Sequence, residues 1–205
     1  MKKLLALLLA LCIGFAFCAC GNEEKNDDKK KTEKGDSAVT DSKEDDGVPY
    51  AGTYEELINN IERFYNGDIE IYRTFGPKVA LDYAEQEQGV DVDAFLQNLA
   101  EGYAEEKKAM EEEYGAYIVV TLIIKDKTKV SEDVLKTMGK SFNETYELIP
   151  ADSVTEGYYL DLNIVVKGDD DETSDSEEWM IAKVDGYWYM VGCDEDGSEA
   201  YFDAP

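Results

Sequence analysis

The sequence predicts an α+β domain in which N-terminal helices pack on a curved, mainly antiparallel sheet of about four strands. Three observations carry this prediction. Apolar residues recur at helical spacing through residues 54–114. Strand-like patterns then fill residues 116–125 and the segment from 158 to 191. Within that last segment, Asp185-Gly186 is a strong signal for a two-residue hairpin. Helices that precede an antiparallel sheet along the chain are typical of α+β domains.

The first helical segment begins after Thr53, a good N-cap, and Glu56 completes a capping box. Its apolar positions recur at helical spacing: Tyr54, Leu57, Ile58, Ile61 and Tyr65. We expect Asp68 to cap a second short helix, which Gly76-Pro77 ends. Pro77 then suits the first turn of a third helix, and Gly89 ends that helix.

The longest helix opens at Asp91 or Asp93 and stops at Gly115. One face carries the apolar residues Phe95, Leu96, Leu99, Tyr103, Met110 and Tyr114. The opposite, solvent-facing side is expected to carry Glu101, Glu105, Glu106, Lys107, Lys108, Glu111, Glu112 and Glu113.

In the strand 116–125, the residues that point to either face are mostly apolar, so we expect other parts of the fold to cover both faces of this strand. Ser131 begins a short helix. From Tyr158 apolar and polar residues alternate, as in a strand with one buried face. Residues 168–178, GDDDETSDSEE, are expected to form a long acidic loop before the hairpin of strands 179–184 and 187–191, and residues 194–205 a loose tail.

The N-terminus has the pattern of a secretory signal: Lys2 and Lys3 precede an apolar run from Leu4 to Phe17. The run ends in Phe17-Cys18-Ala19-Cys20-Gly21, which resembles the lipobox of bacterial lipoprotein precursors, although Phe17 and Cys18 depart from the usual pattern. The resemblance implies that residues 1–19 are a lipoprotein signal peptide and that Cys20 carries the lipid. An ordinary secretory signal cleaved nearby is the alternative.

Residues 20–48 are expected to form a disordered, charged tether that follows the lipid-attachment Cys20, because they hold no aromatic residue and few aliphatic ones. Residues 49–205 then form a single domain. That domain has 37 acidic and 12 basic residues, and the whole chain has a formal net charge of −27. Such a charge argues against nucleic-acid binding, which needs clustered Lys and Arg.

The absence of His excludes Ser-His and Cys-His nucleophilic pairs and His-ligated zinc. The folded part keeps one cysteine, Cys193, which we interpret as a small apolar residue near a strand end. The sequence has no glycine-rich phosphate loop, nucleotide fingerprint or metal-ligand spacing. We therefore expect no cofactor.

Four segments together are similar to the nuclear transport factor 2-like (cystatin-like) superfamily, and in particular to lipoproteins of unknown function from Gram-positive gut bacteria. They are EEEYGAYIVVTLIIKD (111–126), SEDVLKTM (131–138), YYLDLNIVVKG (158–168) and IAKVDGYWYMV (181–191). The resemblance implies a cone formed by a curved sheet around a long helix. The superfamily includes enzymes, transport factors and accessory domains, so the fold does not determine the function.

The candidate site residues are aromatic and acidic. Six rings are candidates for lining a pocket, with core filling as the alternative for each: Tyr72, Phe75, Tyr103, Tyr117, Trp179 and Trp188. Enzymatic members of the superfamily often use an Asp inside the cone, for which Asp161 and Asp82 are candidates, with surface charge the alternative. The acidic loop 169–178 is rich in the carboxylates that Ca²⁺ prefers but lacks EF-hand spacing, so we favour a solvated hairpin loop, with a Ca²⁺ site as the alternative.

These observations favour a membrane-anchored surface lipoprotein, held by a lipid on Cys20 at the extracytoplasmic face of the bacterial cell membrane. Its domain is expected to be a non-enzymatic module that binds a small ligand or an envelope protein. The alternative is an envelope enzyme that uses a carboxylate as acid and base in a cone-shaped pocket.

Overall fold

The computed structural model describes residues 49–203, apart from the side chains of residues 87 and 88. Helices and strands follow in the order α2 (Tyr54–Tyr65), the 3₁₀ helix η2 (Ile69–Thr74), α3 (Lys78–Gln88), α4 (Val92–Tyr114), β1 (Val119–Lys129), α5 (Glu132–Thr145), β2 (Val154–Lys167), β3 (Glu172–Val184), β4 (Tyr187–Gly192) and β5 (Tyr201–Phe202). The predicted α+β class is confirmed. The predicted signal peptide 1–19, Cys20 and the tether 20–48 lie outside the described residues.

The five strands form one antiparallel sheet in the order β1-β2-β3-β4-β5, so each strand pairs with its neighbour in sequence and the sheet does not close. The prediction of about four strands missed β5. In β5, Tyr201 pairs with Gly192 and Phe202 with Val191. The expectation of a loose tail over 194–205 is therefore wrong at residues 201–202, because the end of β4 offers a free strand edge to them, and residues 204–205 lie outside the described part of the chain.

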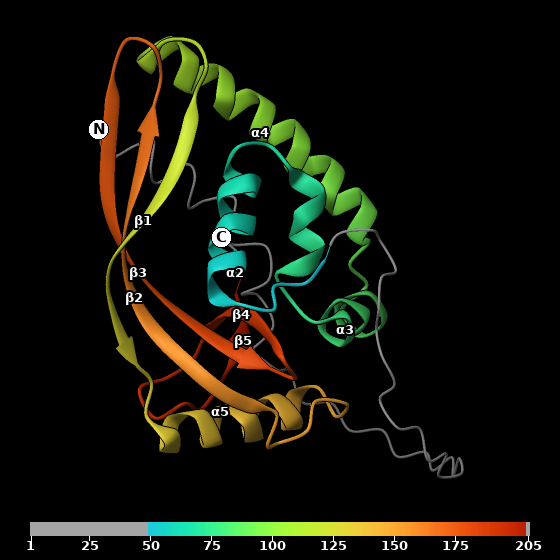
Figure 1. The fold of residues 1–205 in the computed structure, drawn as a ribbon. Helices are drawn as coiled ribbons and strands as arrows, with labels where there is room; N and C mark the ends of the chain where they lie inside the picture. Colours follow the sequence, from blue (N-terminus) through green and yellow to red (C-terminus); the bar gives the residue numbers. More distant parts are fainter. Residues whose placement is uncertain (1–48, 204–205) are drawn as a thin grey trace.

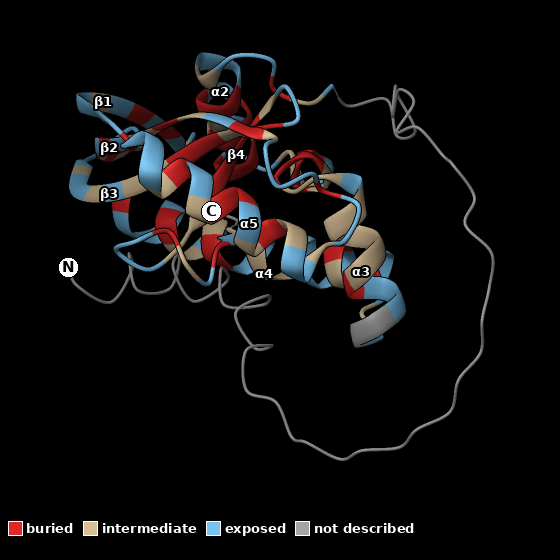
Figure 2. Ribbon diagram, turned by 90° about the horizontal axis from the view of Figure 1, so that it is seen from below, coloured by how far each residue is buried: buried red, intermediate tan, exposed pale blue. Residues whose placement is uncertain are grey.

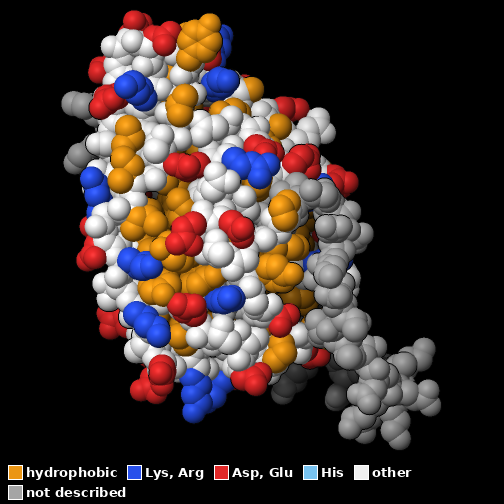
Figure 3. All heavy atoms as spheres, in the orientation of Figure 1, with side chains coloured by type: hydrophobic (Ala, Val, Ile, Leu, Met, Phe, Trp, Pro, Cys, Tyr) orange, Lys and Arg blue, Asp and Glu red, His pale blue; other side chains and the backbone are white. Residues whose placement is uncertain are grey.

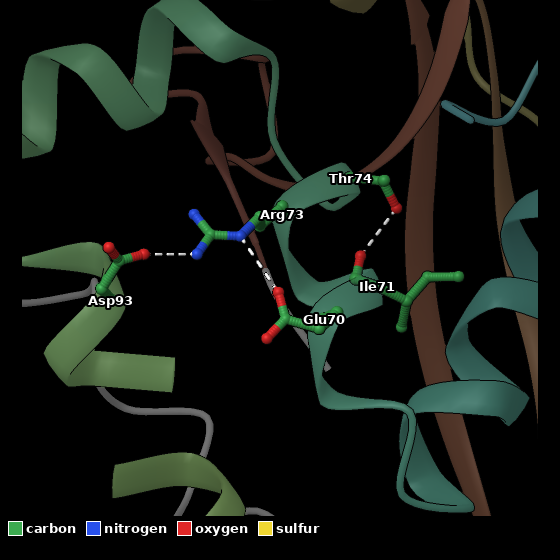
Figure 4. A network of polar contacts seen from close by, with 5 residues as sticks. All are labelled: Glu70, Ile71, Arg73, Thr74 and Asp93. Atoms are coloured by element: carbon green, nitrogen blue, oxygen red, sulfur yellow. Dashed lines mark hydrogen bonds and ion pairs between the residues drawn. The ribbon is translucent and has the colours of Figure 1, made fainter. Parts of the chain in front are cut away.

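The helices lie on both faces of the sheet. Figure 1 shows α2 and η2 between the strands and α4, with α5 across the other end of the sheet. Arg73 of η2 joins this helical layer to the first turn of α4: its Nη2 lies 2.5 Å from Asp93 Oδ1 and its Nε 3.3 Å from Glu70 Oε2 (Figure 4). The Asp93 contact ties η2 to α4, whereas the Glu70 contact lies within η2 and orients the Arg73 guanidinium.

Two hydrophobic cores result, one on each face. The first joins the helical layer to the sheet and includes Leu57, Ile61, Met110, Leu162, Trp188 and Met190. The second lies under α5 and includes Met138, Phe142, Ala182, Tyr189 and Val191. Figure 2 shows buried residues on the facing sides of α2, β4 and α5. Strand β4 is buried on both faces, because its alternate side chains point into the two different cores.

Several predicted helix starts are confirmed by their hydrogen bonds. Thr53 and Glu56 form the capping box, and Asp91 accepts a hydrogen bond from the backbone N–H of Ala94 at 3.0 Å. Ser131 likewise caps α5. Asp68 stands at the N-cap position of the second short helix as predicted, but its side chain makes no capping hydrogen bond. Its carboxylate instead accepts hydrogen bonds from Arg63, with Nη2 2.6 Å away, and the segment forms a 3₁₀ helix.

Strand β1 is not covered on both faces, contrary to the prediction for 116–125. It begins at Val119, and Val120 and Leu122 are buried while Val119 and Ile123 remain exposed. The physical reason is its place at the sheet edge, where the helical layer covers one face only.

The acidic segment 168–178 is not a long loop, because β3 already begins at Glu172. The turn is short and docks on the end of α4. The backbone N–H groups of Asp170 and Asp171 donate to the carbonyl of Tyr114, at 3.0 and 3.2 Å. Pairing with β2 thus holds the acidic residues 172–178 in a strand.

Candidate ligand-binding site

A cavity of about 600 Å³ lies on the α5 side of the sheet. We call it the sheet-face cavity. Its floor consists of residues from adjacent strands that the pairing register brings together. Asp126, Asp161 and Glu178 are partners across β1, β2 and β3. Thr128, Tyr159 and Met180 form the next row. The volume is in the range of small-molecule sites.

Carboxylates dominate the polar lining of the sheet-face cavity. Besides the row of three, Asp194 and Glu195 border it, and no Lys or Arg is among its described lining residues. Like charges directly opposite one another destabilise a sheet. Asp161 and Glu178 are such a pair. A cation bound between them would relieve this repulsion.

The rest of the lining is aromatic and apolar. Tyr159 is 42% exposed, and Met180, Val191 and Cys193 lie beside it. The Cys193 Sγ is 3.6 Å from the Met180 Sδ. Burial, with Asp194 and Asp196, raises the pKa of the Cys193 thiol, so the thiol stays protonated at neutral pH. Cys193 therefore contributes an apolar contact after the end of β4.

The six predicted aromatic candidates do not share one pocket. Tyr72 and Phe75, with ring centroids 5.8 Å apart, line a cavity of about 80 Å³ together with Tyr83, Tyr146 and Phe202. Burial raises the pKa of Tyr146 there to about 12. Trp179 lines the sheet-face cavity.

The other three rings lie elsewhere. Tyr103 packs against Gly67, where a Cβ would come within 2.8 Å of its ring. Tyr117 is 80% exposed and has a positive φ of 59°. Trp188 is buried beneath Tyr54 and Tyr158, with ring centroids 5.9 and 5.6 Å from theirs.

The two candidate aspartates have different surroundings. Asp161 lies in the sheet-face cavity. Asp82 lies on α3, where its carboxylate is 3.3 Å from Lys78 Nζ and its side chain is 44% exposed. Asp82 thus has the surroundings of a surface charge. Within residues 49–203, no three acidic or cysteine side chains are placed to share a metal ion.

Glu106 is a buried carboxylate that the sequence pattern assigned to the solvent-facing side of the long helix. It is 8% exposed, and its Oε2 has no hydrogen-bond partner. Burial raises the pKa of the Glu106 carboxyl. Glu106 lies three residues after Tyr103 and four before Met110, so helical spacing places it on the apolar face of the helix and could have indicated its burial. The surrounding acidic residues hid that signal.

A third cavity, of about 580 Å³, lies between α5 and the start of β2, with Lys136, Lys140, Glu132 and Asp152 at its border. Its charges are mixed and do not favour one ligand class. Glu106 lines none of these three cavities. The sheet-face cavity is thus large, is lined by acidic side chains without a basic one among the described residues, and has aromatic side chains in its wall.

No protein-family model, curated protein or solved structure matches the chain. In the described part of the chain, none of the helices has the length and apolar character needed to cross a membrane.

Proposed function

We propose that this protein is a bacterial surface lipoprotein whose domain binds a small organic cation. A lipid on Cys20 anchors it at the extracytoplasmic face of the cell membrane, and the tether 20–48 holds the domain 49–205 away from the bilayer. The lipobox-like FCACG at 17–21 supports the anchor. The antiparallel sheet with a long helix beside it supports a cystatin-like cone for the domain.

One observation carries the ligand class: Asp126, Asp161 and Glu178 form a row of carboxylates on the floor of a cavity walled by Tyr159. A diamine satisfies this arrangement, because its ammonium groups pair with carboxylates while its methylene chain contacts Tyr159 and Met180. The ligand thereby offsets the repulsion between Asp161 and Glu178.

Isothermal titration with putrescine, and with 1,4-butanediol as its neutral analogue, tests the proposal. The double variant Asp161→Asn/Glu178→Gln is expected to weaken putrescine binding more than tenfold, since a hydrogen bond to a charged group contributes about 1.5–3 kcal/mol. The matched control Glu144→Gln/Glu147→Gln removes the same charge from exposed residues outside the cavity. Absence of putrescine binding, or an equal loss in the control, would contradict the proposal.

The anchor is tested by mass spectrometry of the protein from the membrane fraction. A mature chain that begins at a lipid-modified Cys20 is expected. Cys20→Ser should release the protein from the membrane, whereas Cys18→Ser should leave it anchored. An unmodified Cys20, or a mature chain that begins at another residue, would rule out the lipoprotein assignment.

A second candidate function, an enzyme that uses a carboxylate as acid and base, is favoured by Glu106. Its unpartnered Oε2 and raised pKa suit a proton-transfer group. It ranks second because Glu106 lines none of the cavities described above. A panel of ester and glycoside substrates tests it. Turnover that Glu106→Gln abolishes and the exposed neighbour Glu105→Gln retains would favour the enzyme, whereas no turnover by the wild type would dismiss it.

A further inference from the structure

Three aromatic rings from three different elements converge on the opposite face of the sheet from the sheet-face cavity. They are Tyr54 at the start of α2, Tyr158 of β2 and Trp188 of β4, and we call them the aromatic cage. The Tyr54 ring lies 5.8 Å from that of Tyr158 and 5.9 Å from that of Trp188. Tyr158 stacks on Trp188 at 5.6 Å, with 14° between their planes.

An ammonium group already lies against two of the three rings of the aromatic cage. Lys127 Nζ lies 4.1 Å from the centroid of the Tyr54 ring and 4.5 Å from that of Tyr158. Both distances fall within the roughly 6 Å at which a cation is attracted to an aromatic face. Lys127 lies in β1 between Asp126 and Thr128, which line the sheet-face cavity, so its own side chain points to the opposite face of the sheet. The geometry of the cage thus suits a cation.

The cage opens to solvent on one side. Trp188 is 3% exposed and forms its floor, while Tyr54 and Tyr158 are half-buried and Lys127 is exposed. Figure 3 shows hydrophobic side chains at the surface between the strands and α2, with basic and acidic groups among them. A ligand can therefore reach the rings from solution once the Lys127 side chain moves away.

Acidic groups beside the cage add to its preference for cations. The Tyr158 hydroxyl donates to Glu156 Oε1 at 2.6 Å, which fixes the ring and places a carboxylate at its edge. Hydrogen bonding to Tyr54 lowers the pKa of Glu55, and hydrogen bonding to Tyr54 also raises the pKa of Lys127. Glu55 and Lys127 are therefore both charged at neutral pH.

Lys127 is held in the cage by its two ring contacts and its hydrogen bond to Tyr54, without an ion pair in the described part of the chain. Its ammonium is exposed and has no ion pair within 4 Å among residues 49–203. A primary ammonium is strongly hydrated, and its flexible stem loses entropy when it is fixed. A quaternary ammonium has no N–H groups to hydrate and contacts aromatic rings on several sides, which is the arrangement that aromatic cages use.

We propose that the aromatic cage of Tyr54, Tyr158 and Trp188 is a binding site for a quaternary ammonium group, with Lys127 as a built-in competitor. The site is separate from the sheet-face cavity and does not depend on the function proposed for it. The ammonium group belongs either to a free small molecule or to a choline headgroup of a lipid. Both sources present the same trimethylammonium chemistry to the rings.

Titration with choline, monitored by Trp188 fluorescence in a Trp179→Phe background, tests the proposal with the purified full-length protein. Ionic strength is kept constant with NaCl, and 3,3-dimethyl-1-butanol serves as the neutral isostere of choline. Choline is expected to change the fluorescence saturably, and the isostere is expected to have no effect. No saturable response to choline, or an equal response to the isostere, would overturn the proposal.

Variants identify the site. Lys127→Ala is expected to tighten choline binding about 2- to 5-fold, the factor that corresponds to one exposed cation–π contact. Lys108→Ala removes the same charge from the exposed side of α4 and should leave the affinity unchanged. Tyr54→Leu should weaken binding at least as much as Lys127→Ala tightens it, whereas Tyr54→Phe keeps the ring and should bind nearly as well as the wild type.

Two further measurements complete the test. Thermal unfolding of each variant shows whether a loss of binding reflects a loss of folding, and equal choline affinity in folded Lys127→Ala and Lys108→Ala would overturn the role of Lys127. Sedimentation of the unlipidated Cys20→Ser protein with phosphatidylcholine vesicles, compared with the same protein carrying Tyr54→Leu, distinguishes the two sources. Vesicle binding that Tyr54→Leu abolishes supports a lipid headgroup, and binding of choline alone supports a free small molecule.

Discussion

The side chain of Asn66 exchanges two hydrogen bonds with the backbone of Val120. The Val120 N–H donates to Asn66 Oδ1 at 3.0 Å, and Asn66 Nδ2 donates to the Val120 carbonyl at 2.9 Å. One turn earlier in α2, Glu62 Oε1 accepts from the Leu122 N–H at 2.6 Å. The end of α2 thus satisfies backbone groups of β1 that no strand pairs, and it covers this part of the sheet edge.

Asn66→Ala is expected to lower the free energy of unfolding by about 1–3 kcal/mol, because it leaves a partly buried N–H and carbonyl of Val120 without partners. Urea denaturation measures the change. Asn98→Ala, at an exposed position of α4, is the matched control and should change stability by less than about 0.5 kcal/mol. Similar values for both variants would contradict the role of Asn66 at the strand edge.

Gly168 permits the β2–β3 turn to dock on α4. A Cβ at this position would lie 2.2 Å from the carbonyl oxygen of Tyr114, which accepts hydrogen bonds from the same turn. Gly168→Ala should therefore destabilise the protein by about 2 kcal/mol or more, since the backbone must shift. Gly52→Ala is the control, because its Cβ meets only an ordinary contact at 3.4 Å. Thermal unfolding of both variants measures the difference.

The features that could be predicted from the sequence are those set by local chemistry. The capping box of Thr53 and Glu56 uses residues three apart, and it forms as expected. The Asp185-Gly186 hairpin needs positive φ at both residues, and the observed values are 51° and 92°. The buried and exposed sides of β2 alternate as its sequence does. In each case the signal lies within a few residues of the structure that it specifies.

The features that could not be predicted depend on distant partners. The acidic residues of β3 have low strand propensity, and their pairing with β2 places them in a strand. The row of Asp126, Asp161 and Glu178 depends on a shift of register after Ile124, which no local pattern marks. The aromatic cage likewise joins Tyr54 to Trp188 across most of the domain. The sequence pattern predicts to which face of the sheet a residue points, but it does not predict which residues of the adjacent strands lie beside it.

Glu106 should make stability depend on pH. Burial raises its folded pKa above the ordinary value of 4.5, so the unfolded chain releases this proton at a lower pH than the folded protein does. The contribution of Glu106 to stability is therefore largest below about pH 4.5 and is lost as the pH rises through the folded pKa.

Glu106→Gln cannot ionise, and at pH 7 it should be more stable than the wild type by about 1–3 kcal/mol. The two proteins should converge at low pH, where both side chains are neutral. Urea denaturation across this pH range measures the difference, and the exposed neighbour Glu105→Gln controls for the loss of one charge. A constant difference between Glu106→Gln and the wild type at every pH would contradict the burial of an ionisable carboxyl.

Added salt should stabilise the domain because its acidic residues greatly outnumber its basic ones. The chain has a formal net charge of −27, of which residues 49–205 contribute nearly all. Glu111 and Glu112 add to the repulsion at the C-terminal end of α4, where the helix dipole is itself negative and the acidic turn 168–171 docks. The screening length falls from about 30 Å at 0.01 M salt to about 10 Å at 0.1 M. The melting temperature should therefore rise between these concentrations.

Glu111→Gln/Glu112→Gln should be more stable at low salt, by about 0.3–1 kcal/mol per residue, and should respond less to salt than Glu144→Gln/Glu147→Gln. A melting temperature that does not change with salt, or equal responses of the two double variants, would show that repulsion at the end of α4 does not limit stability.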